Sequence, residues 1–261
     1  MKTVSAAKLR RAQERILSAR PYANQLRQVL SNLAARIENV SHPLLEVRPE
    51  QRILLLVITA DRGLCGAFNA NIVRAGQSFL REHASHDVRL VAAGRKGRDF
   101  FRRRHVQITA EFVNVFGKLE FGTAKEISEK VVLAYSKEEV DAVYLVYNEF
   151  KSVIQQRVVV EKLLPFSRAE LADTQSRIDY IYEQPPQEIF NRMLPRYVEV
   201  QIFRALLESA ASEHGARMGA MDTATRNAGE LVDSLTLNMN RIRQAAITRE
   251  IIEVVSGAGA L

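Results

Sequence analysis

The feature that most constrains this 261-residue chain is a helical stretch of about 70 residues near its C-terminal end. It begins at Pro185-Pro186, since proline is tolerated in the first helical turn, and Pro195 is the only strong helix breaker before Val255. At 1.5 Å per residue this stretch predicts a rod of about 100 Å. Helices of globular proteins seldom exceed about 25 residues, so its length favours a coiled coil. Its expected seam steps alternately by three and four residues: Met218, Met221, Thr225, Ala228, Val232, Leu235, Met239, Ile242 and Ala246.

A second seam of the same kind lies at the N-terminal end of the chain. Pro21 falls within it, and a proline there removes one backbone hydrogen bond and bends the helix. Ser41, His42 and Pro43 end the pattern. Two heptad segments, one at each end, predict a single antiparallel coiled coil. The N-terminal seam consists of Leu9, Ala12, Ile16, Ala19, Ala23, Leu26, Leu30, Leu33, Ile37 and Val40.

Between the two helices, short β-branched runs alternate with amphipathic stretches, a pattern typical of an α/β fold with a mostly parallel sheet. The strands are expected at residues 53–59, 88–93, 106–109, 140–147 and 153–162, and the helices at 68–82, 95–104 and 123–135. The last two strands are close in sequence, so they are expected to pair as an edge hairpin. The predicted domains are therefore an N-terminal coiled-coil helix (1–42), an α/β domain (43–184) and a C-terminal coiled-coil helix (185–261).

Composition narrows the classes of function. The net charge is +7, but residues 1–40 alone carry eight Lys and Arg against two Glu, a net +6. The charge is therefore concentrated on one helix, and the absence of Trp argues against a single-stranded nucleic-acid platform. The longest apolar run, Ile53 to Thr59, is too short to span a membrane. No apolar signal segment follows Met1, and the single cysteine excludes an intrachain disulfide, as expected for a reducing cytoplasm.

A glycine-rich turn between the first strand and the next helix is the most distinctive local motif, running from Ile58 to Asn69. Phosphate loops and nucleophile elbows occupy such positions, but this turn lacks the glycine spacing of a dinucleotide fingerprint and the Gly-Lys-Ser/Thr of a P-loop. Cys65 lies at a helix start, where the helix dipole favours a thiolate, yet the five histidines show no pairing that nominates a base. A tight turn capped by Asp61 or Asn69 is the favoured interpretation.

Two alternatives to a purely structural role follow from these motifs. One is an α/β enzyme or phosphate-binding protein that uses the Gly63–Gly66 turn and Cys65, with helical arms for oligomerisation. The other is a basic scaffold that binds nucleic acid through residues 2–36. The basic junction at Gly94 to Arg98 is read as a solvated loop. No Cys, His and carboxylate cluster has metal-ligand spacing and no carboxylates form an acid–base couple, so no catalytic residue, cofactor or metal is expected.

Several strings resemble the gamma subunits of F-type ATP synthases along the whole chain. The closing string, from Asn240 to Glu250 and from Ile252 to Ala258, is the most specific. The others are Val4–Gln13, Ser18–Tyr22, Asp61–Gly66 with Phe68-Asn69, Leu194–Tyr197 and Ser212–His214.

The resemblance implies a non-catalytic rotor. In that family an asymmetric antiparallel coiled coil turns inside a ring of three alpha and three beta subunits, with a Rossmann-like domain at its foot. Proton flow through the membrane ring drives the rotation, and ATP is made or hydrolysed on the beta subunits. The implied partners are the alpha, beta and epsilon subunits and the membrane c-ring, with no nucleic acid. The implied location is the cytoplasmic face of a bacterial plasma membrane, as a peripheral protein.

The same resemblance suggests contact residues by position. Arg243, Gln244 and Thr248 correspond to residues that contact the catch loops of the beta subunits. Met1 and Lys2 correspond to a stretch that faces the beta levers. Tyr180, Tyr182 and Glu183 correspond to the part of the foot near the c-ring and epsilon. Arginine and glutamine suit this role, because multidentate donors are exchanged readily between successive partners.

The chain differs from the family pattern at its N-terminal end. Family members usually carry about six further turns of helix before the position of Met1. Two explanations stay open: a start codon assigned too far downstream, or a coil that lacks its upper N-terminal half. In the second case the facing C-terminal seam is expected to expose its apolar side chains.

Overall fold

The computed structural model describes residues 1–37, 42–117, 119–152, 155–166 and 182–258. The chain divides into two compact units, Met1–Gly219 and Ala220–Leu261. In chain order the elements are α1 (Lys2–Arg36), η1 (Pro43–Leu45), β1 (Arg52–Ile58), α2 (Phe68–Glu82), β2 (Asp87–Ala93), α3 (Arg95–Arg102), β3 (Ile108–Phe112), α4 (Phe121–Ser136), β4 (Ala142–Phe150), β5 (Gln156–Leu164) and α6 (Pro186–Ala258).

The five strands form one sheet in the order β3-β2-β1-β4-β5. The first four are parallel, and β5 pairs antiparallel with β4, which confirms the predicted α/β fold with a hairpin at one edge. β1 lies in the centre and is buried on both faces, which explains its unbroken apolar sequence. The predicted ranges for β3 and β5 began too early, because edge strands bury one face and their pattern is weaker. Residues 153–154 of the predicted fifth strand lie outside the described residues.

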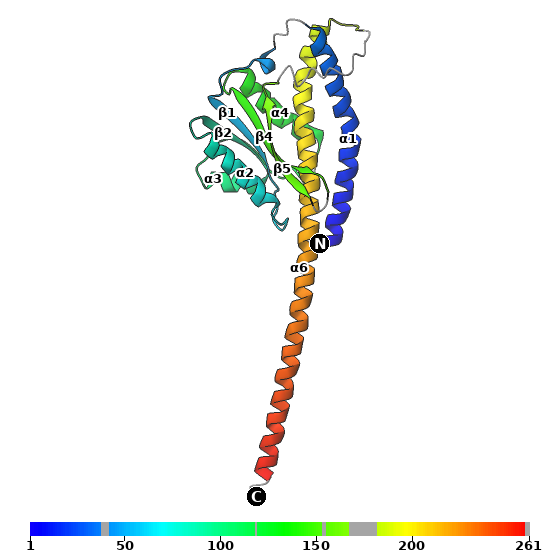
Figure 1. Cartoon of the computed structure of the whole chain (residues 1–261), viewed down its shortest axis with the longest axis vertical. Helices are drawn as coiled ribbons and strands as arrows, with labels where there is room; N and C mark the ends of the chain where they lie inside the picture. The colour runs from blue at the N-terminus through cyan, green and yellow to red at the C-terminus, as the bar shows by residue number, and fades with distance from the viewer. Residues whose placement is uncertain (38–41, 118, 153–154, 167–181, 259–261) are drawn as a thin grey trace. The chain divides into compact units, whose positions relative to one another are not determined.

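Alternate side chains of β1 enter two different cores. Ile53, Leu55 and Val57 pack with buried residues of α2 and α3 on one face of the sheet. Leu54 and Leu56 point to the other face, where α4, α1 and the first part of α6 supply the apolar partners (Figure 1). This period-two alternation is what a strand between two helical layers requires.

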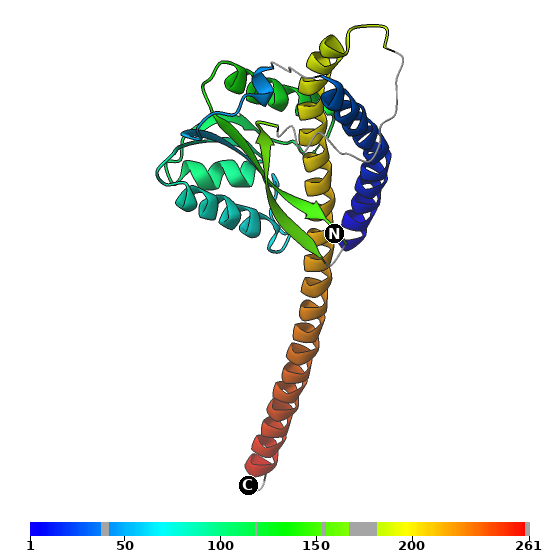
Figure 2. The ribbon, with the colours of Figure 1, turned by 45° about the horizontal axis from the view of Figure 1, so that its top comes forward.

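Within Met1–Gly219, α1 runs antiparallel alongside the first part of α6 (Figures 1 and 2). The predicted N-terminal seam forms the buried face of α1 from Leu9, at 4% exposure, to Leu33, at 0%, and its last predicted member, Val40, lies outside the described residues. It packs in the same core as Leu194 and Leu206 of α6, both fully buried. Both helices continue through their internal prolines, Pro21 and Pro195. The expected antiparallel pair is thus present, and its partner face lies N-terminal to the seam that starts at Met218.

The second unit is the helix of residues 220–258. Large apolar side chains along it are exposed: Leu231, Val232, Leu235, Leu237, Met239, Ile242, Ile247, Ile251, Ile252, Val254 and Val255. The spacing of three and four residues specifies an apolar face, but it does not specify what covers that face. The seam predicted from Met218 to Ala246 is therefore helical, as expected. Its positions from Thr225 to Ala246 are exposed and not buried against a second helix, whereas Met218 and Met221 are partly buried.

Among the described residues, no helix is both long and apolar enough to cross a bilayer.

Candidate interaction site

The glycine-rich turn after β1 ties three strand ends together. Asp61 Oδ1 accepts hydrogen bonds from the backbone N–H of Arg95 at 3.0 Å and of Asn114 at 2.7 Å. Asn69 Oδ1 accepts from the N–H of Ala60 at 2.9 Å. These bonds confirm a structured turn, but they do not cap the following helix, whose N-cap is Ala67 without a side-chain bond. Asp61 and Asn69 instead accept hydrogen bonds from loop amides and so hold the loops in place.

Cys65 in this turn has the wrong environment for a nucleophile. Its side chain is 1% exposed, and Asn69 Nδ2 lies 3.1 Å from its sulfur. Burial, with the nearby Glu213 carboxylate, raises the pKa of the Cys65 thiol above its ordinary value. A protonated thiol in the core is a poor nucleophile and a poor metal ligand. The turn therefore gives no support to the enzyme hypothesis.

The second strand-to-helix junction has no amides to offer an anion. At the start of α3, the N–H of Lys96 donates to Ala60 O at 3.1 Å and that of Gly97 to Thr59 Oγ1 at 2.8 Å. The Arg95 N–H already donates to Asp61. A helix N-terminus binds phosphate through free amides, and here the first three are used within the chain. The prediction of a solvated loop at Gly94 to Arg98 is only partly correct: Arg95 and Lys96 are exposed, but Gly94 and Gly97 are buried and Arg95 is the first residue of α3.

The crevice where open α/β sheets bind ligands is occupied by α6. Such ligands bind beyond the carboxyl ends of the strands where the strand order reverses, here between β1 and β4. At the end of β4, the N–H of Asn148 donates to Ser209 Oγ at 3.3 Å and its carbonyl accepts from Ser212 Oγ at 3.3 Å. The N–H of Phe150 donates to Glu208 Oε2 at 3.0 Å. The sheet thus uses this edge to hold a helix.

A buried ionic cluster holds α6 to the glycine-rich turn. The Glu213 side chain is almost fully buried between His214, 2.7 Å away, and Arg217, whose Nη2 donates to Gly63 O at 3.1 Å. Burial alone would raise the pKa of Glu213, but contact with His214 and Arg217 outweighs it and lowers that pKa below its ordinary value. The carboxylate is therefore charged at neutral pH and pairs with Arg217, the side chain that bonds α6 to the turn.

Sequence reasoning assigned no attachment role to the polar residues that hold α6 to the sheet, although Ser212 falls in a string that carries the family resemblance. Glu208, Ser209 and Ser212 are each at most 6% exposed. In the sequence they can be recognised as a run of polar residues on the otherwise apolar face of a helix. On a solvent-exposed face, by contrast, polar residues are the rule. Such a run indicates buried hydrogen-bond partners, because unsatisfied polar groups are costly in a core.

The predicted beta-contact residues of α6 lie together on the helix of residues 220–258. Arg243, Gln244 and Thr248 are all exposed. Gln244 and Thr248 are four residues apart and so share a face. The Thr248 hydroxyl donates to the Gln244 carbonyl at 2.8 Å, a bond within the helix itself. The structure brings these three residues to one exposed region, next to apolar side chains such as Ile247.

The other predicted contact residues lie elsewhere. Met1 is 77% exposed at the N-cap of α1, and Lys2 is the first residue of that helix. Tyr182 is half-buried against the core near the start of α6, and Glu183 is exposed. Tyr180 lies outside the described residues. Within the described chain, no group of three His, Cys, Asp or Glu residues is placed to hold a metal ion.

The chain is similar to known proteins along its whole length. A family model described as ATP synthase covers residues 1–261. The ATP synthase gamma chain of Solibacter usitatus (strain Ellin6076) is 52% identical over 264 residues, which cover 100% of this chain and 91% of the relative. That of Desulfitobacterium hafniense (strain DSM 10664 / DCB-2) is 52% identical over 261 residues, covering 100% and 92%.

Solved structures agree with the fold. A chain of the Tetrahymena thermophila mitochondrial ATP synthase central stalk and c-ring matches with a TM-score of 0.65 and 29% identity, covering 86% of this chain and 97% of that one. A chain of the Euglena gracilis mitochondrial ATP synthase matches with a TM-score of 0.64 over 98% of this chain and 95% of that one. Its identity of 17% makes it a likeness of fold alone.

Proposed function

The chain belongs to the ATP synthase gamma-chain family, and from this membership we propose how it acts as the central-stalk subunit of an F-type ATP synthase. It couples rotation of the membrane ring to ATP synthesis or hydrolysis on the beta subunits, with alpha and beta subunits and the c-ring as partners. The chain itself is non-catalytic. It is a peripheral part of a membrane complex, at the cytoplasmic face of a bacterial plasma membrane.

One observation supports this mechanism most directly: the apolar side chains exposed along residues 220–258. Eleven such side chains on one helix are far more than the scattered exposed apolar residues of a typical surface. Burying them against a partner gains roughly 25 cal/mol per Å² of apolar area. We place the alpha and beta subunits around this helix, and Arg243, Gln244 and Thr248 at the contact with the beta catch loops.

The polar groups among these apolar residues suit a partner that changes. Arg243 and Gln244 are exposed donors on long side chains, and the Thr248 hydroxyl is bonded only to its own helix. Such groups gain charge-assisted or neutral hydrogen bonds with one beta subunit and lose them as the helix turns to the next. Met1 and Lys2 are proposed to face the beta levers, and Tyr180, Tyr182 and Glu183 the c-ring and epsilon.

The test is reconstitution with the alpha and beta subunits of the same genome, followed by size-exclusion chromatography and an ATPase assay. We expect co-elution in one large complex. Changing Gln244→Ala with Thr248→Ala is expected to lower the ATPase rate by about fivefold or more, the size of a modest coupling free energy.

A matched control is available on the same helix. The Thr236 hydroxyl donates to the Val232 carbonyl at 2.8 Å, the same local bond that Thr248 makes. Thr236→Ala therefore controls for the threonine part of the double change and is expected to leave the rate within about twofold. An equal loss in the Thr236→Ala complex, or full activity in the double variant, would refute the proposed contact.

The contact with the ring has its own test. Glu183→Lys reverses the charge of an exposed side chain near the start of α6. It is expected to weaken binding to the c-ring and epsilon while the ATPase rate of the complex with alpha and beta stays unchanged. A variant that binds the ring normally would remove Glu183 from this contact.

A further inference from the structure

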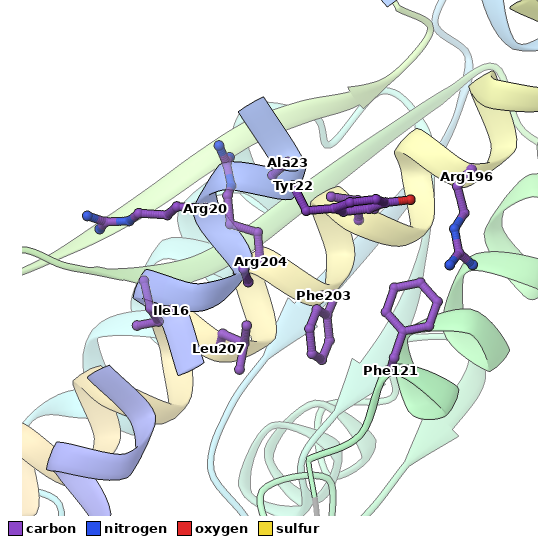
Figure 3. A pocket seen from close by; sticks show the side chains of 11 residues that line it. Ile16, Arg20, Tyr22, Ala23, Phe121, Arg196, Phe203, Arg204 and Leu207 are labelled. Carbon is purple, nitrogen blue, oxygen red and sulfur yellow. The ribbon is translucent and has the colours of Figure 1, made fainter. Parts of the chain in front are cut away.

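A polar groove of about 660 Å³ opens between α1, β5 and α6, within Met1–Gly219. It borders a smaller apolar pocket, and Arg20 and Arg204 line both. Figure 3 shows these two side chains extending away from the aromatic rings of the apolar pocket. The α6 wall of the groove consists of residues spaced by three and four, which share one face of the helix. They are Tyr197, Gln201, Arg204 and Glu208.

The charged side chains of the groove divide into paired and unpaired groups. Arg27 of α1 and Arg157 of β5 form no ion pair or hydrogen bond with any residue that the structure describes. The other charged side chains each have a partner of opposite charge, so these two arginines supply positive charge that nothing nearby neutralises. Fixed cations in a concave site attract anionic ligands. The pairs are Arg20–Glu208 at 3.5 Å, Arg204–Glu161 at 3.2 Å, Lys151–Glu149 at 2.8 Å and Lys162–Glu50 at 2.6 Å.

The two unpaired arginines lie toward opposite ends of the groove. Burial raises the pKa of Tyr197, and the Arg27 guanidinium is near enough to oppose that effect. Arg157 is near the start of β5, beside the stretch of β4 to which Glu208 is bonded. Tyr197 and Glu208 are eleven residues apart on α6, which is about 16 Å along the helix axis. A ligand that contacts both arginines therefore needs two separated anionic groups.

A buried hydrogen-bond acceptor lies between these ends. Gln201 is 9% exposed, and its Oε1 atom has no hydrogen-bond partner among the described residues. A buried acceptor without a partner is costly, and a ligand that donates to it removes that cost. An ionised carboxylate or a fully ionised phosphate has no hydrogen to donate, whereas a hydroxyl group does. The middle of the ligand is therefore expected to carry hydroxyl groups.

We propose that this groove binds a small polyhydroxylated molecule with a phosphate group at each end, of the sugar-bisphosphate class. One phosphate pairs with Arg27 and the other with Arg157, since the arginine fork donates two parallel hydrogen bonds to phosphate oxygens. A hydroxyl between them donates to Gln201 Oε1. Because α1, β5 and α6 each supply one contact, the bound molecule joins these three elements. The site does not depend on the rotor role.

The probe is fructose 1,6-bisphosphate, titrated into the purified full chain by isothermal titration calorimetry. We expect a dissociation constant on the order of 0.1 mM, as for a ligand of about twenty non-hydrogen atoms. Fructose 6-phosphate can pair with only one arginine and is expected to bind at least about tenfold more weakly. Equal binding of the bisphosphate and the monophosphate would overturn the two-arginine site.

Arginine variants locate the binding. Arg27→Gln and Arg157→Gln each remove one unpaired cation from an exposed side chain, and each is expected to weaken bisphosphate binding about tenfold. In either variant the bisphosphate is also expected to lose most of its advantage over the monophosphate. Arg11→Gln removes the same charge from an exposed position of α1 outside the groove, so binding is expected to stay within about twofold.

Gln201→Leu tests the contact in the middle of the groove. It keeps the approximate size of the side chain and removes the acceptor, so it is expected to weaken binding of fructose 1,6-bisphosphate about threefold. Binding of 1,6-hexanediol bisphosphate, which lacks the hydroxyl groups, is expected to stay unchanged. Circular dichroism checks that each variant is folded. A loss in Arg11→Gln as large as in Arg27→Gln would show a response to the general charge of α1 and would refute the site.

Discussion

The two parts of α6 share one helix and one kind of spacing, yet they have opposite surroundings. In residues 186–217 the apolar positions are core: Leu194, Ile202 and Leu206 are completely buried. In residues 220–258 the apolar positions face outward, with Leu235 at 57% and Ile242 at 61% exposure. A heptad pattern therefore shows that a helix has an apolar face, but it leaves open whether the same chain covers it.

The polar residues of the two stretches differ in the same way. Glu208 and Ser212 of the first stretch are bonded to named atoms of β4. Thr225 and Thr248 of the second donate only to a carbonyl four residues earlier in their own helix. Side chains bonded to atoms of another element hold a helix in place on a sheet. Side chains bonded only within their own helix can instead form bonds with one partner protein after another.

The largest effect on the free energy of unfolding is expected for a glycine at the sheet, in Met1–Gly219. Gly94 has φ +104°, and a Cβ there would lie 1.9 Å from the Thr59 carbonyl oxygen. Gly94→Ala is expected to lower the free energy of unfolding by at least about 4 kcal/mol. All seven tyrosines precede Gly219, so near-UV circular dichroism during urea unfolding reports on Met1–Gly219 alone.

Gly229 on the exposed helix provides the matched substitution. A Cβ there meets nothing within 4 Å, so Gly229→Ala is expected to raise helix stability by about 0.5–1 kcal/mol. The thermal far-UV signal measures this change. The same sign for both alanine substitutions would contradict the contrast between the two regions.

A leucine pair sharpens the contrast within α6 itself. Leu206→Ala is expected to lower the free energy of unfolding by about 2–4 kcal/mol, because it leaves a cavity in the core. Leu235→Ala is expected to change it by less than about 0.5 kcal/mol and to weaken assembly with the alpha and beta subunits instead. If Leu235→Ala destabilised the free chain as much as Leu206→Ala, the conclusion that Leu235 is exposed would be wrong.

The buried carboxylate predicts a pH dependence. Because the folded-state pKa of Glu213 is lowered, the charged group stabilises the fold above its unfolded pKa of about 4.5, and this stabilisation is lost as the pH falls through the folded value. Glu213→Gln is expected to cost about 1–3 kcal/mol at pH 7 and to flatten the loss below about pH 4.5. Glu230→Gln on the exposed helix serves as the control. If the free energy of unfolding of Glu213→Gln fell with pH as steeply as that of the unchanged chain, other carboxylates would account for the loss of stability in acid.

No effect on assembly or activity, and only a small effect on stability, is expected at Cys65. Cys65→Ala removes one buried sulfur and is expected to lower the free energy of unfolding by about 1 kcal/mol. Assembly and ATPase activity of the reconstituted complex are expected to stay unchanged. A large loss of activity with normal assembly would restore the hypothesis of a reactive thiol in the glycine-rich turn.

Much of the fold was predictable because its signals are local. The apolar run at Ile53 predicts a central parallel strand, and the close succession of the last two strands predicts the edge hairpin. The glycine-rich turn was also recognisable, although its role was not. Asp61 acts on amides of Arg95 and Asn114, more than thirty residues away in sequence, and no local pattern records such a bond.

By itself, the sequence determined the long helices, the mostly parallel sheet and the family, because these depend on periodicity, strand length and motif strings. The tertiary structure decided which part of α6 joins the core, since that depends on the polar anchors Glu208, Ser212 and Arg217 meeting atoms of β4 and of the Gly63 turn. It also decided that the crevice at the strand ends holds a helix. Burial is a property of the assembled chain, whereas spacing along a helix is already present in the sequence.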